Sequence, residues 1–305
     1  MIRGLKIVAF LLLVLSAAQP SAAFAEERFA ADYLGEITGA GGVGFDQPTD
    51  IAVSGGRLYV LDGLNQRVAV FDLSGNYLFR FSVDLRRPVG ICADKRGELY
   101  VPDAQTAIVR IYTPDGKDNG GFRVAPARVK EKPGITDCAV SQNDEIFLAD
   151  NSNHHIHVYD RSGRRLRWFG NFGSNDDEFR YPATVAIDVD NIVYVTDVIN
   201  NSVKGFRASG EPRVEMGGWG ITPGKLFRPK GVMLVGKHVY VTDSYTGAVH
   251  VFASSGAFYG LLGRGDGGKL RFRTPTNMAL AGSRFFIVEQ LGNRVSMWKL
   301  TGARD

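Results

Sequence analysis

The sequence is dominated by a repeat that occurs six times between residues 50 and 302. Each copy has an acidic residue at the same place, and successive acids are 41 to 47 residues apart. An aromatic residue stands three positions before each acid, and a glycine stands thirteen positions after it. Repeats of this length indicate that one structural unit recurs and that neighbouring units share their cores. The acids, called anchors below, are Asp62, Asp103, Asp150, Asp197, Asp243 and Glu289.

Each repeat predicts four short strands. In the first copy, residues 51–53, 58–61 and 67–71 are rich in the β-branched and aromatic residues that suit strands, with short turns between them. Gly75 predicts the next hairpin turn, and a less regular strand follows. Helical periodicity is absent. Four antiparallel strands per unit of about 46 residues are typical of a propeller blade, so we expect an all-β, six-bladed β-propeller.

The ends of the repeat region predict how the ring closes. The sixth copy stops near Gly302, which leaves no room for its fourth strand. Residues 29–37, before the first copy, read as a strand without a blade of its own. We expect this N-terminal strand to complete the last blade, because that arrangement removes an exposed sheet edge.

The motifs of the repeat resemble those of the NHL family of propellers. The first copy carries Phe-x-x-Pro at residues 45–48, Tyr-Val-x-Asp at 59–62, Asn-x-Arg-Val at 65–68 and Phe-Asp-x-x-Gly at 71–75. The third copy departs from the pattern through a displaced Pro133, and the sixth has Glu289 in place of Asp. The resemblance covers roughly residues 29–302. It implies the fold and not an activity, because propellers serve many unrelated functions.

The N-terminus predicts export. Arg3 and Lys6 precede the apolar run 7–15, and Ala23-Phe24-Ala25 matches a cleavage site. An uncleaved anchor is the alternative, but nine helical residues rise only about 14 Å, against a hydrocarbon core of about 30 Å. We therefore expect residues 1–25 to be a signal peptide and residues 26–305 to be a periplasmic or extracellular propeller. No later stretch of the sequence predicts a membrane span.

Charge argues against nucleic acid as a partner. The full chain has a formal net charge of +4, and loss of Arg3 and Lys6 with the leader leaves +2. A near-neutral exported domain lacks the basic character typical of nucleic-acid binding.

The only two cysteines, Cys92 and Cys138, lie in strand patterns. Either they are small core residues or they form one bridge between neighbouring blades.

The anchors and the histidines favour structural roles. An acid at a strand end can accept the N–H bonds of the following turn, so we interpret the anchors as turn-holding residues. His155 and His157 share one strand face, in a column that is mostly polar in the other copies, and we interpret that face as solvated. Metal binding by this pair remains an alternative. No catalytic motif is present, and we assign no catalytic residue.

The innermost strands offer a candidate metal site. Asp50, Asp137 and Asn277 stand where NHL repeats usually carry glycine, and innermost strands line the channel. Oxygen ligands from several blades could hold calcium there, although a hydrated polar rim is the simpler interpretation. Related propellers include calcium-dependent lactonases and zinc-dependent peptide-amidating lyases. A metal-dependent hydrolase or lyase at the channel is therefore our alternative function.

Binding through loops is the function that the sequence favours. In a four-stranded blade, the turns after the anchors and the links between blades emerge on the same face. Variable loops on a rigid ring make a binding surface, and we expect this face to bind a protein or peptide partner. The predicted binding residues are Asn65, Asn153, His154, Asn200 and Tyr245.

Overall fold

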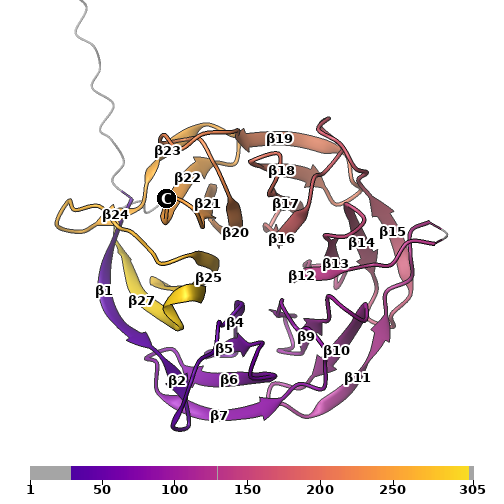
Figure 1. Ribbon diagram of the computed structural model, residues 1–305, viewed down its shortest axis with the longest axis horizontal. Helices are drawn as coiled ribbons and strands as arrows, with labels where there is room; N and C mark the ends of the chain where they lie inside the picture. Colours follow the sequence, from indigo (N-terminus) through magenta and orange to yellow (C-terminus); the bar gives the residue numbers. More distant parts are fainter. Residues whose placement is uncertain (1–28, 129, 302–305) are drawn as a thin grey trace, which may run out of the picture.

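The computed structural model describes residues 29–128 and 130–301, which form six β-sheets around a central axis (Figure 1). Each sheet is one blade, with its first strand at the axis and its last strand at the rim. The predicted all-β, six-bladed propeller is confirmed. The predicted signal peptide, residues 1–25, lies outside the described residues.

The blades follow one another along the chain. Blade 1 contains β4 (Asp50–Ser54), β5 (Arg57–Asp62), β6 (Arg67–Asp72) and β7 (Tyr77–Ser82). Blade 2 contains β8 (Cys92–Ala93), β9 (Leu99–Pro102), β10 (Ile108–Tyr112) and β11 (Asp118–Arg123). Blade 3 contains β12 (Ile135–Val140), β13 (Ile146–Asp150), β14 (His155–Tyr159) and β15 (Arg165–Phe169).

The second half of the ring repeats this order. Blade 4 contains β16 (Pro182–Ile187), β17 (Ile192–Asp197), β18 (Ser202–Arg207) and β19 (Pro212–Gly217). Blade 5 contains β20 (Pro229–Val235), β21 (His238–Asp243), β22 (Ala248–Ala253) and β23 (Phe258–Leu261). Blade 6 contains β25 (Pro275–Ala281), β26 (Arg284–Glu289) and β27 (Arg294–Thr301), with the short 3-10 helix η1 (Gln290–Gly292) after its anchor.

The N-terminal strand closes the ring. β1 (Ala30–Ile37) pairs antiparallel with β27, from Ala30 opposite Thr301 to Ile37 opposite Val295. The short β24 (Gly263–Arg264) then pairs in parallel with β1 at the rim. A further two-stranded ribbon, β2 (Gly39–Ala40) and β3 (Val43–Gly44), connects β1 to blade 1. The prediction that residues 29–37 complete the last blade is therefore confirmed.

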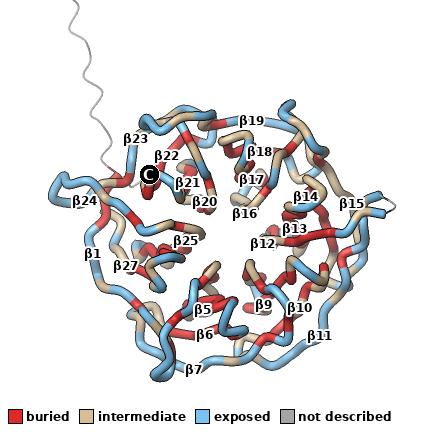
Figure 2. Tube along the Cα trace, viewed as in Figure 1, coloured by how far each residue is buried: buried red, intermediate tan, exposed pale blue. Residues whose placement is uncertain are grey.

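The hydrophobic core lies between the blades, because each sheet packs its two faces against its neighbours. Six apolar clusters fill the six inter-blade spaces. The cluster between blades 6 and 1, for example, joins Phe286 and Val295 to Leu58 and Phe71. Figure 2 shows buried residues concentrated in the middle strands, whereas the outermost strands are largely exposed. The aromatic residues three positions before the anchors are all buried.

Strand direction gives the ring two different faces. The loop face carries the turns after the anchors and the links between blades, and the hairpin face carries the turns between the first and second and between the third and fourth strands of each blade. At the hairpin face Gly75, with φ +87°, donates its N–H to the Asp72 carbonyl, and its equivalents Gly116, Gly163, Gly210 and Gly256 share this positive φ. Glycine is required there because other residues rarely adopt such a φ.

A disulfide joins two innermost strands. Cys92 in β8 and Cys138 in β12 are bonded, with their Cα atoms 5.7 Å apart. Of the two alternatives that the sequence left open, the structure contains the bridge between neighbouring blades. In the described part of the chain, no helix has the length and apolar character needed to cross a membrane.

Candidate functional site

The six anchors are buried and hold the links of the loop face. Each anchor carboxylate accepts a hydrogen bond of 2.5 to 3.0 Å from a backbone N–H in the link that enters its own blade. Several also accept N–H bonds from their turn, as Asp103 does from Gln105 and Thr106. The geometry agrees with the structural role that we predicted for the anchors. The link donors are Asp46, Arg86, Gly134, Arg180, Phe227 and Arg273.

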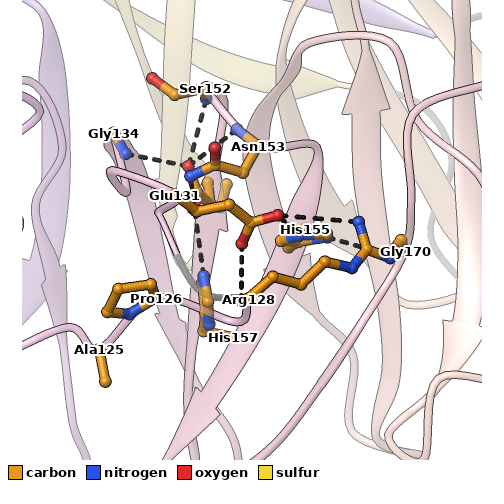
Figure 3. A network of polar contacts seen from close by, with 12 residues as sticks. Ala125, Pro126, Arg128, Glu131, Gly134, Ser152, Asn153, His155, His157 and Gly170 are labelled. Carbon is orange, nitrogen blue, oxygen red and sulfur yellow. Dashed lines mark hydrogen bonds and ion pairs between the residues drawn. The ribbon is translucent and has the colours of Figure 1, made fainter.

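The histidine column is buried, so our interpretation of a solvated face is wrong. His157 Nε2 lies 3.1 Å from Asp150 Oδ2, and both side chains are fully buried (Figure 3). Lys204, at the same position in blade 4, donates to the carbonyls of Asn175 and Glu178. These side chains are covered because the link that enters the blade folds over them. The sequence of the link has no periodicity, so it does not predict that the link covers them.

His155 extends the same network to the link between blades 2 and 3. Its Nδ1 lies 2.9 Å from the Gly170 carbonyl and its Nε2 lies 3.3 Å from Glu131 Oε1, while Glu131 also faces Arg128 (Figure 3). Although burial alone would raise the pKa of Asp150, hydrogen bonds from His157 and from Gly134 and Asn153 lower it below its usual value. Among the described residues, no three His, Cys, Asp or Glu side chains are grouped as a metal site.

Three of the predicted binding residues are asparagines that turn toward the anchors. The side-chain amide of Asn65 donates to Asp62, that of Asn153 to Asp150, and that of Asn200 to Asp197, at 2.6 to 2.9 Å. Asn200 also donates to the Gly173 carbonyl. These amides therefore shape the turns, and their part in binding stays a prediction.

The other two predicted residues, His154 and Tyr245, lie among aromatic side chains on the loop face. The His154 ring is 5.0 Å from Phe172 and 4.9 Å from Tyr181, measured between ring centroids. Tyr245 is 63% exposed and lies 4.3 Å from the Phe227 ring. His154 thus packs against the link 170–181, and Tyr245 packs against the next link, 218–228.

Sequence reasoning missed three highly exposed apolar residues on these links. Phe172 is 61% exposed, Trp219 is 73% exposed and Ile221 is 67% exposed. Phe172 forms a parallel bridge with Phe179, and Trp219 forms the equivalent bridge with Leu226. The two links are therefore built alike and hold an aromatic ring outward at the same place. The signal was available as the related segments 170–173 and 217–220, Gly-Asn-Phe-Gly and Gly-Gly-Trp-Gly. We define the aromatic patch as Phe172, Tyr181, Trp219, Ile221 and Tyr245.

Several basic side chains on the loop face lack acidic partners among the residues that the structure describes. Arg180 lies over the Phe172 ring at 5.7 Å and makes no ion pair within the described ranges. Lys230 precedes the innermost glycine of blade 5, and both burial and the nearby Arg228 lower its pKa. The link into blade 5 is basic, with Lys225 and Arg228 and no acidic residue, whereas the link into blade 4 carries the exposed Asp176 and Asp177. Further basic residues without an ion pair in that part of the chain are Arg86, Arg87, Lys132, Arg228 and Arg273.

The three predicted calcium ligands meet at the axis, but they are largely occupied by other bonds. Asp50 accepts from Ile51, Ile91 and Asn277 at 2.5 to 2.7 Å. Asp137 Oδ2 accepts from the Val185 N–H at 2.9 Å, and Asp137 Oδ1 is buried without a partner. The Asp50 and Asp137 side chains interact electrostatically, so the structure brings all three predicted residues to one place.

Burial makes this carboxyl pair hard to ionise. It raises the pKa of Asp50 to about 6, and burial together with the charge of Asp50 raises the pKa of Asp137 well above its usual value. Two buried carboxyls in contact retain a proton between them because two close negative charges repel. A shared proton also provides the partner that Asp137 Oδ1 lacks.

The arrangement does not fit calcium well. Calcium takes six to eight oxygen ligands, which the protein and bound water must supply together. Here both oxygens of Asp50 and one of Asp137 accept N–H bonds, and Asn277 Oδ1 accepts from Met278. Only one unengaged carboxylate oxygen remains, so the site as folded is better suited to a proton than to calcium.

Comparisons with known proteins agree with the repeat and the ring. A family model described as "NHL repeat" matches residues 45–71, which run from the end of the link before blade 1 through most of β6. The chain is a six-bladed β-propeller that carries an NHL repeat. Protein brain tumor of Drosophila melanogaster is 35% identical to this NHL-repeat propeller over 68 residues, which is 22% of the chain. The match covers only 6% of that protein's length.

Solved structures with the same fold include enzymes. The propeller is similar to a streptogramin B lyase, with a TM-score of 0.66, 12% identity and coverage of 91% of this chain and 99% of that one. Virginiamycin B lyase from Staphylococcus aureus with quinupristin gives a TM-score of 0.65, 13% identity and coverage of 87% and 98%. A gluconolactonase from Xanthomonas campestris gives 0.63, 15% identity and 88% of both chains. At these identities the likeness shows the fold alone.

Proposed function

We propose that this NHL-repeat propeller is an exported binding module that holds a protein or peptide partner on its loop face. The observation that carries the proposal is the aromatic patch, whose large apolar side chains project from two similar links and from the turn after the blade 5 anchor. Exposed apolar surface that is rimmed by polar groups is typical of an interaction site. Aromatic residues are also the side chains most enriched at the centres of interfaces.

Basic side chains on the blade 5 side of the patch favour an acidic partner. Arg180 on the blade 4 link, Arg228 on the blade 5 link and Lys230 in β20 form no ion pair with an acidic partner among residues 29–128 and 130–301. The blade 4 link also carries the exposed Asp176 and Asp177, so the basic excess lies on the blade 5 side. An acidic segment would supply those partners and would be attracted to the face before contact. We therefore expect a polypeptide that combines Asp or Glu with apolar or aromatic residues.

The disulfide supports the proposed location. Cys92 and Cys138 are bonded in blades 2 and 3, and disulfides persist mainly outside the cytoplasm. The pattern of Arg3, Lys6 and the apolar run that follows is the reason to place the mature chain in the periplasm or outside the cell. Mass spectrometry of the protein isolated from its native envelope tests this directly, and the expected N-terminal residue is Glu26.

The binding experiment uses peptides of defined sequence. The mature chain, residues 26–305, is immobilised and a random peptide library displayed on phage is selected on it. The same selection is made on a variant that carries Phe172→Ala, Trp219→Ala and Tyr245→Ala. We expect acidic peptides with aromatic residues to be enriched on the wild-type protein alone. Synthetic versions should bind the triple variant at least about tenfold more weakly.

Val189→Ala is the matched control, because Val189 is 80% exposed but lies on the hairpin face. It should leave peptide affinity unchanged, and all variants should melt within a few degrees of the wild-type protein. Enrichment of the same peptides on the triple variant would overturn the proposal. So would tighter binding of single-stranded RNA than of any selected peptide.

A further inference from the structure

A second site lies at the rim of the ring, away from the central channel, and it shares only Ile221 with the aromatic patch. A cavity of about 550 Å³ is present where β23 ends and the link to blade 6 leaves. Its walls come from Phe29 next to β1, from Ile221 and Pro223 on one link, and from Leu262 and Leu270 on another. Figure 1 shows this second link and β24 beside β1. The volume falls within the range of small-molecule sites.

The cavity is lined by a buried histidine whose ring packs against Phe252 and Phe258 but whose polar atoms are not used by the fold. His250, in β22, is only 2% exposed, and Nδ1 is buried without a partner. Neither of its ring nitrogens forms a hydrogen bond with another described residue, whereas His157 at the equivalent position bonds to Asp150. Burial lowers the pKa of His250 to about 4, so the ring is neutral near pH 7. A neutral imidazole offers one N–H donor and one acceptor.

Two cations that line the cavity lack acidic partners among the described residues. Lys269 and Arg271 line it, are exposed, and make no ion pair within the described part of the chain. Arg264 also lines it but is paired with Asp266 at 3.2 Å. Apolar walls, a buried imidazole without hydrogen bonds to the described residues and two unpaired cations therefore occur in one cavity.

We propose that this cavity binds a single small amphiphile that has an apolar body and a carboxylate head group. The apolar body is expected to pack against Phe29, Leu262 and Leu270. The carboxylate can accept the His250 N–H bond and is balanced in charge by Lys269 and Arg271. A buried carboxylate is stable only when it is hydrogen-bonded and paired in this way. This site is independent of the peptide-binding function proposed above.

Isothermal titration of the mature protein with decanoate tests the proposal. We expect saturable binding of one decanoate, and binding weaker by about tenfold or more for decanol and for decyltrimethylammonium. The double variant Lys269→Glu/Arg271→Glu should lower decanoate affinity by a similar factor. Lys117→Glu is the matched control, because Lys117 is exposed on the hairpin face of blade 2 and should leave affinity unchanged.

A second variant tests the cavity without changing charge. A Cβ added at Gly260, which lines the cavity, would meet only Phe29 Cδ2, at 3.8 Å. Gly260→Leu should therefore fold, occupy part of the cavity and reduce the binding of decanoate more than that of acetate. His250→Leu should weaken binding as well, and its melting temperature shows whether it folds.

Three outcomes would overturn the proposal. These are the absence of saturable decanoate binding to the wild-type protein, equal affinity in the charge-reversed double variant, and binding only to vesicles that contain phosphatidylglycerol. The Phe172, Trp219 and Tyr245 triple variant should bind decanoate like the wild type. A failure of the decanoate-binding proposal can thus be distinguished from a failure of the peptide-binding proposal.

Discussion

The Asn277 side-chain amide donates a 2.5 Å hydrogen bond to Asp50 Oδ1, although the two residues are 227 positions apart. They belong to the last and the first blade, so the bond closes the ring at the axis while β1 closes it at the rim. Asp50 Oδ2 continues the connection by accepting from the Ile91 N–H of blade 2 at 2.6 Å. Threonines do the same elsewhere, as Thr242 Oγ1 donates to the Thr276 carbonyl and Thr276 Oγ1 to the Thr49 carbonyl. Hydrogen bonds therefore join neighbouring blades at the axis, whereas the apolar clusters join them farther out.

Loss of the Asn277 amide should destabilise the ring. Asn277→Ala removes the donor to Asp50 and leaves a buried carboxyl with fewer partners, which costs about 1–3 kcal/mol. Chemical denaturation of the mature protein measures the change in the free energy of unfolding. Asn119→Ala is the control, because its amide reaches Glu98 on the surface and its loss should cost little. Equal effects of the two substitutions would contradict the role assigned to the axial bond.

The carboxyl pair at the axis should make stability fall as pH rises. The folded-state pKa values of Asp50, about 6, and Asp137 lie above those of the unfolded chain, so the folded protein binds more protons. Stability from these groups is complete below pH 4, near the unfolded pKa, and is lost as pH rises through the folded values. Asp137→Asn removes one charge, and its amide can donate to Asp50 while its carbonyl still accepts from Val185.

The stability of Asp137→Asn relative to that of the wild type should therefore increase from pH 5 to pH 8. We expect the difference in unfolding free energy to grow by about 1 kcal/mol or more, since one pKa unit corresponds to 1.36 kcal/mol. The raised pKa of Asp197, about 6, arises mainly from burial and is common to both proteins, so it cancels in the comparison. A difference that is constant with pH would show that the pair does not share a proton.

Added calcium should leave the wild-type melting temperature unchanged, because the site offers one unengaged carboxylate oxygen.

The fold could be predicted from the sequence because every blade repeats the same buried columns. Tyr59 and its equivalents mark a strand that is covered on both sides, and residues 29–37 had no other blade to join. The environment of His157 could not be predicted in this way. Alternation along a strand tells which side chains share a face, but the link that covers the face has no periodicity. For the same reason Trp219 and the rim cavity were missed, since both depend on how links fold against blades.

The axial candidates were only partly predictable. The departures from glycine at Asp50, Asp137 and Asn277 identified residues that do meet, because each lies in the first half of an innermost strand. Their chemistry depends on which N–H groups point at them. The donors Ile91 and Val185 belong to the neighbouring blades, and the sequence does not show how one blade is oriented against the next. The pairing of Cys92 with Cys138 was left open for a related reason, since it requires knowing that β8 and β12 are adjacent.

The anchors should be necessary for folding and not for ligand binding. Asp62 is fully buried, accepts the Asp46 N–H at 3.0 Å, and is paired with Arg67 at 2.8 Å. Asp62→Ala leaves the Arg67 charge buried and unpaired, which costs about 3–5 kcal/mol. The double variant Asp62→Ala/Arg67→Met should recover part of this loss, because it removes the stranded charge. Urea denaturation of the three proteins measures both effects, and a double variant less stable than Asp62→Ala would contradict them.

The disulfide should contribute substantially to the stability of the exported protein. The bridge closes a loop whose ends are 46 residues apart, and such a loop predicts about 4 kcal/mol from the lower entropy of the unfolded chain. Cys92→Ala/Cys138→Ala should lower the melting temperature, and reduction should lower that of the wild type toward the same value. The double variant serves as its own control, since a reductant should leave it unaffected. If the reductant changed neither protein while the two melted at the same temperature, the bridge would make no contribution. The propeller would then depend on its apolar clusters and axial hydrogen bonds alone.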